Sequence, residues 1–389
     1  MNLAFMQSAL VEKAAGGYLR TRQCVEYEQD GVICIDGKHF LNFSSNDYLG
    51  MRQQPEVLQA WVEGLAQFGA GSGASPLVTG YTRAHANLEA YLASLLNRDA
   101  VLLFNSGFAA NQAVCQALFT EPGVIFADKF MHASAIDGAL HSEASVRRFR
   151  HNDVEHLHAL LEKHSTDRKL IMSEGVFSMD GDVAPVKDLV NLSEQFQAPL
   201  MLDDAHGFGV LGKDGAGTVE SMSLSQDNVP ILMATFGKAV GTAGAFIAGS
   251  QTLIDYLINF ARHYIYSTAM PSAQAVATLQ SLVLIGKGSA QKALQDNIGY
   301  FQQQASMLGI PLADSDTAIQ PIIIGDPQKA VDISKRLQTL GIWVTAIRYP
   351  TVPKHQDRLR ITLSAKHSQQ DIEALLDALK IALGEQVCQ

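Results

Sequence analysis

Short, almost entirely apolar runs recur along the first two thirds of the chain and alternate with longer amphipathic stretches. Such runs are typical of strands buried on both faces of a sheet. The runs that we expect to form strands are 101–104, 124–127, 169–172, 199–202, 231–236 and 245–249. The stretches that we expect to form helices between them are 107–119, 132–142, 153–164 and 186–197. This alternation predicts an α/β fold with a mostly parallel, doubly wound sheet.

The pattern changes after Ser250, where longer helical stretches appear at 251–262 and 271–308. Three strand candidates and a final amphipathic helix follow, at 318–324, 342–347, 358–363 and 368–383. This arrangement predicts a second, smaller α+β domain. The first 45 residues contain a hairpin-like stretch, VICIDGKHFLNF, and could pack on either body. We therefore expect an N-terminal segment, a large domain, and a linking helix with a small domain, at 1–45, 46–255 and 256–389.

Composition narrows the class of protein. The 389 residues carry 29 Lys and Arg against 39 Asp and Glu, a net charge of −10, which argues against a broad nucleic-acid surface. No apolar run approaches the roughly 18 residues of a membrane helix, and the N-terminus does not resemble a signal peptide. The four cysteines, Cys24, Cys34, Cys115 and Cys388, form no metal or disulfide pattern, so we expect a cytoplasmic protein.

Polar groups follow two of the predicted strands, where open α/β sheets bind ligands. Asp203 and His206 come directly after 199–202, and Lys238 ends the run at 231–236. A lysine at the end of a buried strand indicates a lowered pKa or a covalent partner, although a lysine reaching to solvent is the ordinary alternative. Asp203 could likewise only cap a turn.

Three glycine-containing stretches have different interpretations. Ser106–Phe108 begins a predicted helix after a strand, where free N–H groups favour an anion. The stretch 69–80 is equally compatible with a ligand loop and with a surface loop. GFGVLG at 207–212 matches GxGxxG, but the following KDGAGT does not favour the helix that a dinucleotide site requires.

Histidines and hydroxyls complete the set of candidate groups. His132, Ser178 and Thr235 stand with the groups above at predicted strand ends. Pyridoxal 5'-phosphate requires this combination: an anion site for its phosphate, a carboxylate for its ring nitrogen, a donor for its phenolic oxygen and a lysine for its aldehyde. A metal site is not indicated, because His151, His156 and His158 lie in a polar stretch typical of solvated surface.

These groups lie in strings that resemble, in order, those of the fold-type I pyridoxal-phosphate enzymes and, within them, the α-oxoamine synthases. The strings are NFSSNDYLG at 42–50, NSGFAANQA at 105–113, HAS at 132–134, EGVFSMDGD at 174–182, DDAHGFGVLG at 203–212, TFGK at 235–238, YSTAMP at 266–271 and RLRITL at 358–363. The resemblance covers nearly the whole chain. It implies a fold-type I transferase that binds pyridoxal 5'-phosphate on a mostly parallel sheet with helices on both faces.

The resemblance also implies roles for individual residues. Lys238 would carry the cofactor covalently, Asp203 would pair with its ring nitrogen and His206 would bind its phenolic oxygen. His132 would stack on the ring and also lie on the substrate side. The further implied cofactor contacts are Gly107, Phe108, Ser178, Thr235 and Thr268, the last toward the cofactor of a neighbouring subunit. The further implied substrate contacts are Arg20, Asn46, Thr351 and Arg360, of which Arg360 would bind the amino-acid carboxylate.

FARHYIYST and PTVP resemble the branch of the family that joins L-alanine to a pimeloyl thioester, on acyl carrier protein or coenzyme A, for biotin synthesis. A relative that uses glycine or another acyl thioester is the alternative. A dinucleotide oxidoreductase would depend on the single GxGxxG, and a non-catalytic regulator would need a DNA-binding segment. The family implies a homodimer. An acidic carrier would need a basic patch, for which Arg147, Arg148 and Arg150 are candidates, although they could equally form an exposed strand face.

Overall fold

The chain folds into two compact units, which we describe separately. The computed structural model describes residues 3–384, so Cys388 lies outside the described residues. The large unit contains residues 46–178 and 182–292. The small unit contains residues 1–45, 179–181 and 293–389. The N-terminal 45 residues, which the sequence left unassigned to either body, are therefore part of the small unit.

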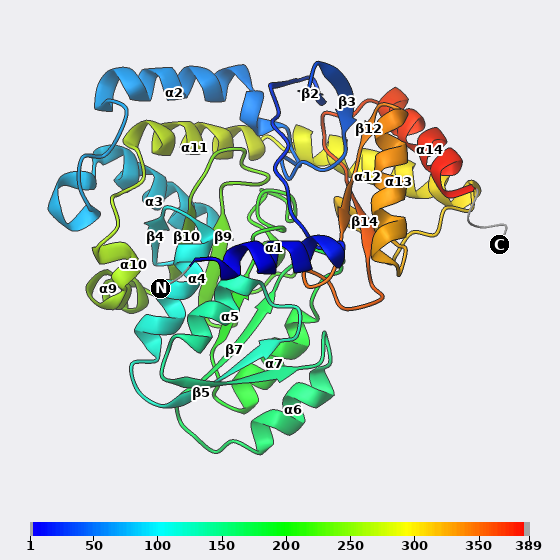
Figure 1. The fold of residues 1–389 in the computed structure, drawn as a ribbon. Coiled ribbons are helices and arrows are strands. Elements are labelled where there is room, and N and C mark those ends of the chain that lie inside the picture. Colours follow the sequence, from blue (N-terminus) through cyan, green and yellow to red (C-terminus); the bar gives the residue numbers. More distant parts are fainter. Residues whose placement is uncertain (1–2, 385–389) are drawn as a thin grey trace. The chain divides into compact units, whose positions relative to one another are not determined.

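A seven-stranded sheet forms the centre of the large unit (Figure 1). Its strands, in spatial order, are β4 (Ala100–Phe104), β10 (Ala245–Gly249), β9 (Ile231–Thr235), β8 (Leu200–Asp203), β7 (Lys169–Glu174), β5 (Gly123–Asp128) and β6 (Ala144–Phe149). β10 runs antiparallel to both of its neighbours, β4 and β9, and the other adjacent pairs of this sheet are parallel. The predicted mostly parallel sheet is confirmed, and the apolar runs form strands because helices bury both of its faces.

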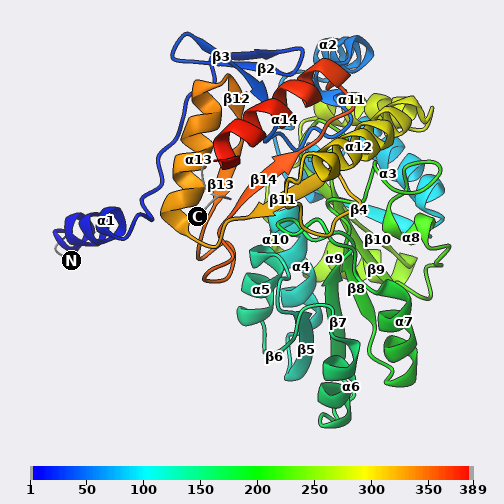
Figure 2. The ribbon, with the colours of Figure 1, turned by 90° about the vertical axis from the view of Figure 1, so that its right-hand side faces the viewer.

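Helices cover this sheet in two groups (Figure 2). One group contains α4 (Gly107–Leu118), α5 (Ala133–Leu140), α9 (Gln251–Phe260) and α10 (Arg262–Ile265), of which α5, α9 and α10 all contact α4. The other contains α6 (Val154–Glu162) and α7 (Val186–Gln195), which contact each other. A short helix, α8 (Thr218–Ser221), follows β8 at a distance in sequence. The strand-and-helix alternation therefore produces the expected doubly wound layers.

The large unit continues beyond residue 255, where the sequence had suggested its end. Its helix α11 (Ser272–Ile285) packs on α2 (Pro55–Phe68) and α3 (Arg83–Leu96). The α2 contact is close, since a Cβ built on Gly64 would lie 2.7 Å from Ala273 Cα. The single helical stretch expected at 271–308 is wrong: it is broken after α11, where Gly288 has φ +77°, and α12 (Ser289–Met307) begins there.

The small unit contains two sheets and flanking helices. One sheet has the order β1 (Tyr27–Gln29), β2 (Val32–Ile35), β3 (Lys38–Asn42) and β12 (Ile342–Trp343), and the other has the order β11 (Ile319–Ile323), β14 (Arg358–Thr362) and β13 (Thr345–Ile347). Its described helices are α1 (Phe5–Ala15), most of α12, α13 (Pro327–Thr339) and α14 (Gln369–Gly384). The hairpin expected at VICIDGKHFLNF is β2–β3.

The strand expected at 342–347 is divided between these two sheets. Its first part, β12, pairs in parallel with β3, and its second part, β13, pairs antiparallel with β14. The residue between the two parts, Val344, is fully buried. The run is therefore buried only in part, at Ile342 and Val344, and it joins two sheets. Within residues 3–384, none of the helices is both long and apolar enough to cross a membrane.

Candidate active site at the carboxyl edge of the central sheet

The last residue of β8, Asp203, is held by hydrogen bonds on both of its carboxylate oxygens. Asn111 Nδ2 on α4 donates to Oδ2 at 2.9 Å, and the backbone N–H of Ala205 donates to Oδ1 at 3.1 Å. The side chain is only 4% exposed. These donors fix the orientation of the carboxylate at the strand end.

His132 is connected to this carboxylate through Ser134. Asn111 Nδ2 also donates to Ser134 Oγ at 2.9 Å, and that hydroxyl lies 2.7 Å from His132 Nδ1. The backbone N–H of Ser134 donates to the same ring nitrogen at 3.2 Å. Since Nδ1 accepts hydrogen bonds, the neutral imidazole carries its proton on Nε2. Burial lowers the pKa of His132, against the attraction of Asp203, so the ring is a neutral donor near pH 7.

Lys238 lies in the short connection from β9 to β10. The backbone of this connection is fixed by hydrogen bonds from Gly241 N to Lys238 O and from Thr242 N to Phe236 O, each 2.9 Å. Thr235 Oγ1 donates to Gly244 O at 2.8 Å and accepts from Gly237 N at 3.3 Å.

The ammonium of Lys238 interacts with the groups around β8. Its positive charge contributes to the lowered pKa of His132 and opposes the raised pKa values of two buried carboxyls, Glu174 and Asp204. Lys238, Asp203 and His132 therefore share one electrostatic cluster.

The N-terminus of α4 lies beside Thr235. Ser106 caps the helix by accepting a hydrogen bond from Ala109 N at 3.2 Å. A Cβ built on Gly107 would lie 3.8 Å from Thr235 Cβ, so the two residues are neighbours. Phe108 is exposed, and its N–H and that of Gly107 belong to the first turn, where backbone donors have no partner within the helix. This geometry suits an anionic group.

A further predicted residue, Thr268, lies at the rim of this edge. Asn105, which follows β4, donates from Nδ2 to the backbone carbonyl of Thr268 at 2.5 Å, and the Thr268 side chain is exposed. Asn46 is half-buried at the start of the large unit.

His206 is buried and lies with Nδ1 2.6 Å from the hydroxyl of Tyr48. The same hydroxyl donates to Asn46 Oδ1 at 3.3 Å, so Tyr48 connects Asn46 with His206.

A buried carboxyl that the sequence did not suggest lies next to Asp203. Glu174 ends β7 and is paired with Asp203 in the parallel register. The backbone N–H groups of His132 and Ser178 donate to it. Burial raises the pKa of Glu174 well above its usual value, and the negative charge of Asp203 raises it further. Glu174 therefore connects the loop of His132 with that of Ser178.

The second aspartate, Asp204, is closely surrounded by glycines, of which Gly207 belongs to the stretch 207–212. It accepts hydrogen bonds from Thr218 N at 2.7 Å and Thr218 Oγ1 at 2.6 Å. A Cβ on Gly207 would lie 2.1 Å from Asp204 Oδ1, and one on Gly217 would lie 2.0 Å from Oδ2. No helix follows until α8, so a dinucleotide loop is not formed and GFGVLG serves packing.

The other glycine-rich stretch, 69–80, is bound to the segment that follows α10. Ser72 Oγ lies 2.8 Å from Ala269 O and 2.6 Å from Met270 O, and Ala269 N donates to Ala74 O at 3.0 Å. The stretch is therefore attached to its own unit by backbone contacts.

Three predicted substrate residues belong to the small unit. Arg20 Nη2 donates to Thr351 Oγ1 at 3.3 Å, and both side chains are exposed. Arg360 lies on β14, is 7% exposed and donates to Thr362 Oγ1 at 3.0 Å.

The neighbouring arginine of β14 has a separate partner. Arg358 Nη1 donates to Asp180 Oδ1 at 2.6 Å, an ion pair within the same unit.

The interpretation of His151 as solvated surface is wrong. Its ring lies between the carboxylates of Asp128 and Asp182, at 3.0 and 2.8 Å. The chain turns through Asn152, with φ +53°, before α6 begins, so these residues precede the helix. Among the described residues, no group of three or more His, Cys, Asp and Glu is arranged to hold a metal.

The three candidate arginines of a basic patch lie on or next to β6, the edge strand. Arg147, Arg148 and Arg150 are all exposed. Arg148 donates to Lys129 O, and Arg150 forms an ion pair of 2.6 Å with Asp153. Arg150 therefore brings little net positive charge.

The donor set of the large unit fits pyridoxal 5'-phosphate. It offers a buried, hydrogen-bonded carboxylate at Asp203 for a protonated ring nitrogen and a helix start at Gly107 for a phosphate. It also offers a lysine in the same electrostatic cluster and a neutral imidazole at His132. These are the groups that this cofactor requires.

Sequence reasoning had given no role to several residues of this network, although they lie in strings that it had selected. Asn111 lies in NSGFAANQA, Tyr48 in NFSSNDYLG, Ser134 in HAS and Glu174 in EGVFSMDGD. The only sequence signal for each of these residues was the string that contains it. The reason is that each side chain contributes by a hydrogen bond to another residue and not by its own chemistry.

Comparison with known proteins shows which family the chain resembles over most of its length. Residues 38–379 match the family of class I and II aminotransferases. The chain is 48% identical over 375 residues to an 8-amino-7-oxononanoate synthase of Aeromonas hydrophila, covering 96% of this chain and 94% of that protein. It is 47% identical to one of Cronobacter sakazakii, covering 97% and 98%.

Solved structures give the same result for the fold. A serine palmitoyltransferase of Sphingomonas wittichii superposes with a TM-score of 0.92 at 27% identity, covering 99% of this chain and 97% of that one. An 8-amino-7-oxononanoate synthase of Francisella tularensis superposes with a TM-score of 0.78 at 31% identity, covering 90% and 99%. Both proteins are similar to this chain over most of its length.

Proposed function

Because the chain belongs to the class I and II aminotransferase family and, within it, to the pyridoxal-phosphate-dependent 8-amino-7-oxononanoate synthases of biotin biosynthesis, we propose that it condenses L-alanine with a pimeloyl thioester. The thioester is carried by acyl carrier protein or coenzyme A. The products are 8-amino-7-oxononanoate, CO2 and the free thiol. The observation that carries this proposal is the cluster of Lys238, Asp203 and His132 at the carboxyl edge of β8.

The proposed cofactor contacts follow from this cluster and from the α4 start. Asp203 keeps a proton on the ring nitrogen, His206 binds the phenolic oxygen, and His132 stacks on the ring. The remaining contacts, with the phosphate and its surroundings, are Gly107, Phe108, Ser178, Thr235 and, from a neighbouring subunit, Thr268. Support for the phosphate contacts comes from the free N–H groups of α4 beside Thr235.

Four residues are proposed to contact the substrate. Arg360 binds the carboxylate of alanine, a task that suits the planar guanidinium. Asn46, Arg20 and Thr351 contribute to substrate binding, supported for the last two by the hydrogen bond between them.

The proposed reaction requires a base at the alanine α-carbon. Bound pyridoxal phosphate supplies an electron-accepting ring for the pair left at that carbon. Lys238 Nζ, once its amine is free, takes the α-proton, and Asp203 stabilises the ring proton throughout. A bond then forms from the α-carbon to the acyl carbon, and the C–S bond breaks. The bond to the carboxylate breaks to release CO2, and a proton returns to the α-carbon.

His132 is proposed to assist at the carbonyl oxygens. Its lowered pKa keeps it neutral, and Ser134 occupies Nδ1, so Nε2 is available as a donor. A neutral donor stabilises a developing negative charge on oxygen without protonating it fully.

The test is product identification by mass. The purified protein is incubated with L-alanine or glycine and with pimeloyl, acetyl or succinyl thioesters. We expect 8-amino-7-oxononanoate from alanine and the pimeloyl thioester. If another pair is used and this pair gives no product, the chain is a different α-oxoamine synthase.

Lys238→Ala gives a second test. We expect loss of turnover and of the shift in visible absorbance that alanine produces, because the base and covalent anchor are missing. Turnover that survives this change would contradict the role of Lys238.

We also propose a homodimer, supported by the exposed side chain of Thr268 at the rim of the site. Sedimentation or light scattering measures it directly. A monomer with full activity would contradict the role of Thr268.

A further inference from the structure

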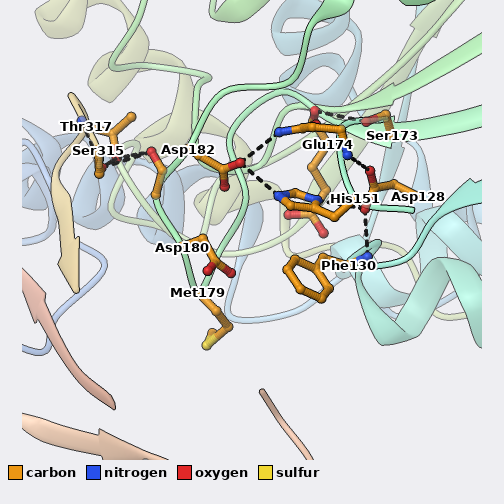
Figure 3. Close-up of polar contacts among 12 residues, drawn as sticks. Asp128, Phe130, His151, Ser173, Glu174, Met179, Asp180, Asp182, Ser315 and Thr317 are labelled. Carbon is orange, nitrogen blue, oxygen red and sulfur yellow. Dashed lines mark hydrogen bonds and ion pairs between the residues drawn. The ribbon is translucent and has the colours of Figure 1, made fainter. Parts of the chain in front are cut away.

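His151 lies outside the residues used above, in the centre of a polar cluster of the large unit (Figure 3). Its Nδ1 is 3.0 Å from Asp128 Oδ1, and its Nε2 is 2.8 Å from Asp182 Oδ2. The ring stacks on Phe130, with centroids 4.3 Å apart, and meets Phe177 edge-on at 4.4 Å. Four contacts therefore fix this one side chain.

The contacts come from two different loops. Asp128 ends β5 and Phe130 follows it, on the segment that leads directly to His132. Phe177 and Asp182 lie on the segment after β7, on either side of Ser178 in sequence. His151 thus contacts both loops. On each loop it meets one carboxylate and one aromatic ring.

The hydrogen bonds require a doubly protonated ring. Ionised carboxylates only accept, and a neutral imidazole has one N–H. With the neutral ring, one of the two contacts would bring two acceptors together. The two carboxylates raise the pKa of His151 to about 9, against the opposing effect of burial. The charged groups that contact the ring are Asp128 and Asp182, and its faces meet the uncharged Phe130 and Phe177.

Asn152 extends the same connection. Its backbone N–H donates to Asp128 Oδ2 at 2.9 Å, and its Nδ2 donates to Asp182 Oδ2 at 2.7 Å. Phe130 N donates to Asp128 Oδ1 at 2.7 Å. The carboxylates are therefore oriented before they meet the imidazolium, so the ring is held in one geometry.

We propose that His151 is a positioning residue: as an imidazolium it joins the loop of His132 to the loop of Ser178 and so holds both groups at the cofactor. The inference rests on the proposed function only in naming those two residues as the groups that are positioned. The test of this inference uses neither alanine nor a thioester. Its result can therefore be interpreted even if the protein does not catalyse the proposed condensation.

The first experiment compares His151→Gln with wild type and with the control His158→Gln. His158 is partly exposed and lies 3.7 Å from Glu162 on its own helix, away from both loops. Hydrogen–deuterium exchange of the holoenzyme is measured in peptides containing Phe130 and Phe177, and the dissociation constant of pyridoxal phosphate is measured by absorbance. We expect faster exchange in both peptides and cofactor affinity about tenfold weaker for His151→Gln, which is about 1.4 kcal/mol.

Unchanged exchange in both peptides would overturn the proposal, as would equal effects in the control. Faster exchange with unchanged cofactor affinity would also overturn it, because His151 would then stabilise the loops without positioning the groups that hold the cofactor.

Asp182→Asn keeps an acceptor oxygen and removes one charge, so it tests the proposal even where His151→Gln does not fold. Wild type should protect both loops fully below pH 6.5 and lose that protection progressively as the pH rises toward about 9, where the imidazolium loses its proton. Asp182→Asn should lose that protection at a lower pH and bind the cofactor more weakly there. The same pH dependence in the variant and the wild type would contradict a role for the charge of His151.

Discussion

Asp203 and Asp204 are consecutive in sequence, and both are almost fully buried, yet their surroundings differ completely. Asp203 accepts from Asn111, which continues through Ser134 to His132. Asp204 accepts twice from Thr218. One carboxylate is connected to candidate catalytic groups, and the other to the backbone that surrounds it.

Glycine is the second difference. A Cβ on Gly175, Gly207 or Gly217 would lie within 2.3 Å of an Asp204 oxygen. Desolvation accordingly raises the pKa of Asp204 to about 7, despite the bonds from Thr218. Burial alone therefore does not distinguish a catalytic carboxylate from a structural one, but the partners do.

The largest effect should come from Asp203→Asn. The variant keeps the shape of the side chain but loses the charge that stabilises the ring proton. We expect turnover to fall about a thousandfold, or about 4 kcal/mol in the barrier, with little change in unfolding free energy. The measurements are kcat at saturating cofactor and urea unfolding. Turnover within tenfold of wild type would contradict the catalytic importance of Asp203, and the proposed difference between Asp203 and Asp204 would then not hold.

Asp204→Asn should affect stability, in a pH-dependent way. The folded-state pKa is raised from 3.8 to about 7, so the stabilisation by this carboxyl is complete below pH 3.8 and is lost as the pH rises toward 7. Asparagine resembles the protonated carboxyl and does not titrate. Between pH 5 and pH 8 we expect the wild type to lose on the order of 2–3 kcal/mol relative to the variant. Unfolding curves that stay parallel over this range would show that Asp204 titrates normally.

Asn111→Leu should weaken the connection between Asp203 and His132. The leucine has a similar volume but offers no donor, so we expect turnover about tenfold lower and weaker cofactor binding, a change of about 1.4 kcal/mol. Gln116→Leu, on the same helix, is the matched control. If both variants behave alike, the network has no functional importance.

The smallest effect should come from Thr218→Val, which removes one of the two bonds to Asp204. We expect a loss of about 1–2 kcal/mol in unfolding free energy, and unchanged turnover per folded molecule. Thr339→Val, an exposed site, is the control for the substitution itself. A loss of turnover without a loss of stability would make Asp204 part of the active site.

The sequence predicted the central sheet well because its strands are buried on both faces, which is the strongest pattern of an α/β fold. The sequence-based prediction was wrong at 342–347, where one apolar run is divided between two sheets. It was also wrong at Gly288, where glycine interrupts the expected helix. Local patterns report burial, but they do not report which partner an element pairs with.

The candidate site was predictable only for residues whose chemistry is visible in the side chain itself. Lysine, histidine and aspartate at strand ends suggested Lys238, His206 and Asp203. Asn111 was not predictable, because its importance comes from two hydrogen bonds to residues distant in sequence. His151 was misinterpreted for the same reason, since its partners Asp128 and Asp182 become neighbours only in the folded chain.

The short backbone connection between β9 and β10, which carries Lys238, determines how the amine of this lysine can move. Its backbone is fixed by Gly241, Thr242 and Thr235, so the amine can change position only by rotation about the bonds of its own side chain. Rotations of that kind take picoseconds to nanoseconds, whereas loop rearrangements take up to microseconds. The amine of Lys238 can therefore be redirected on the faster of these timescales, without rearrangement of the backbone that carries it.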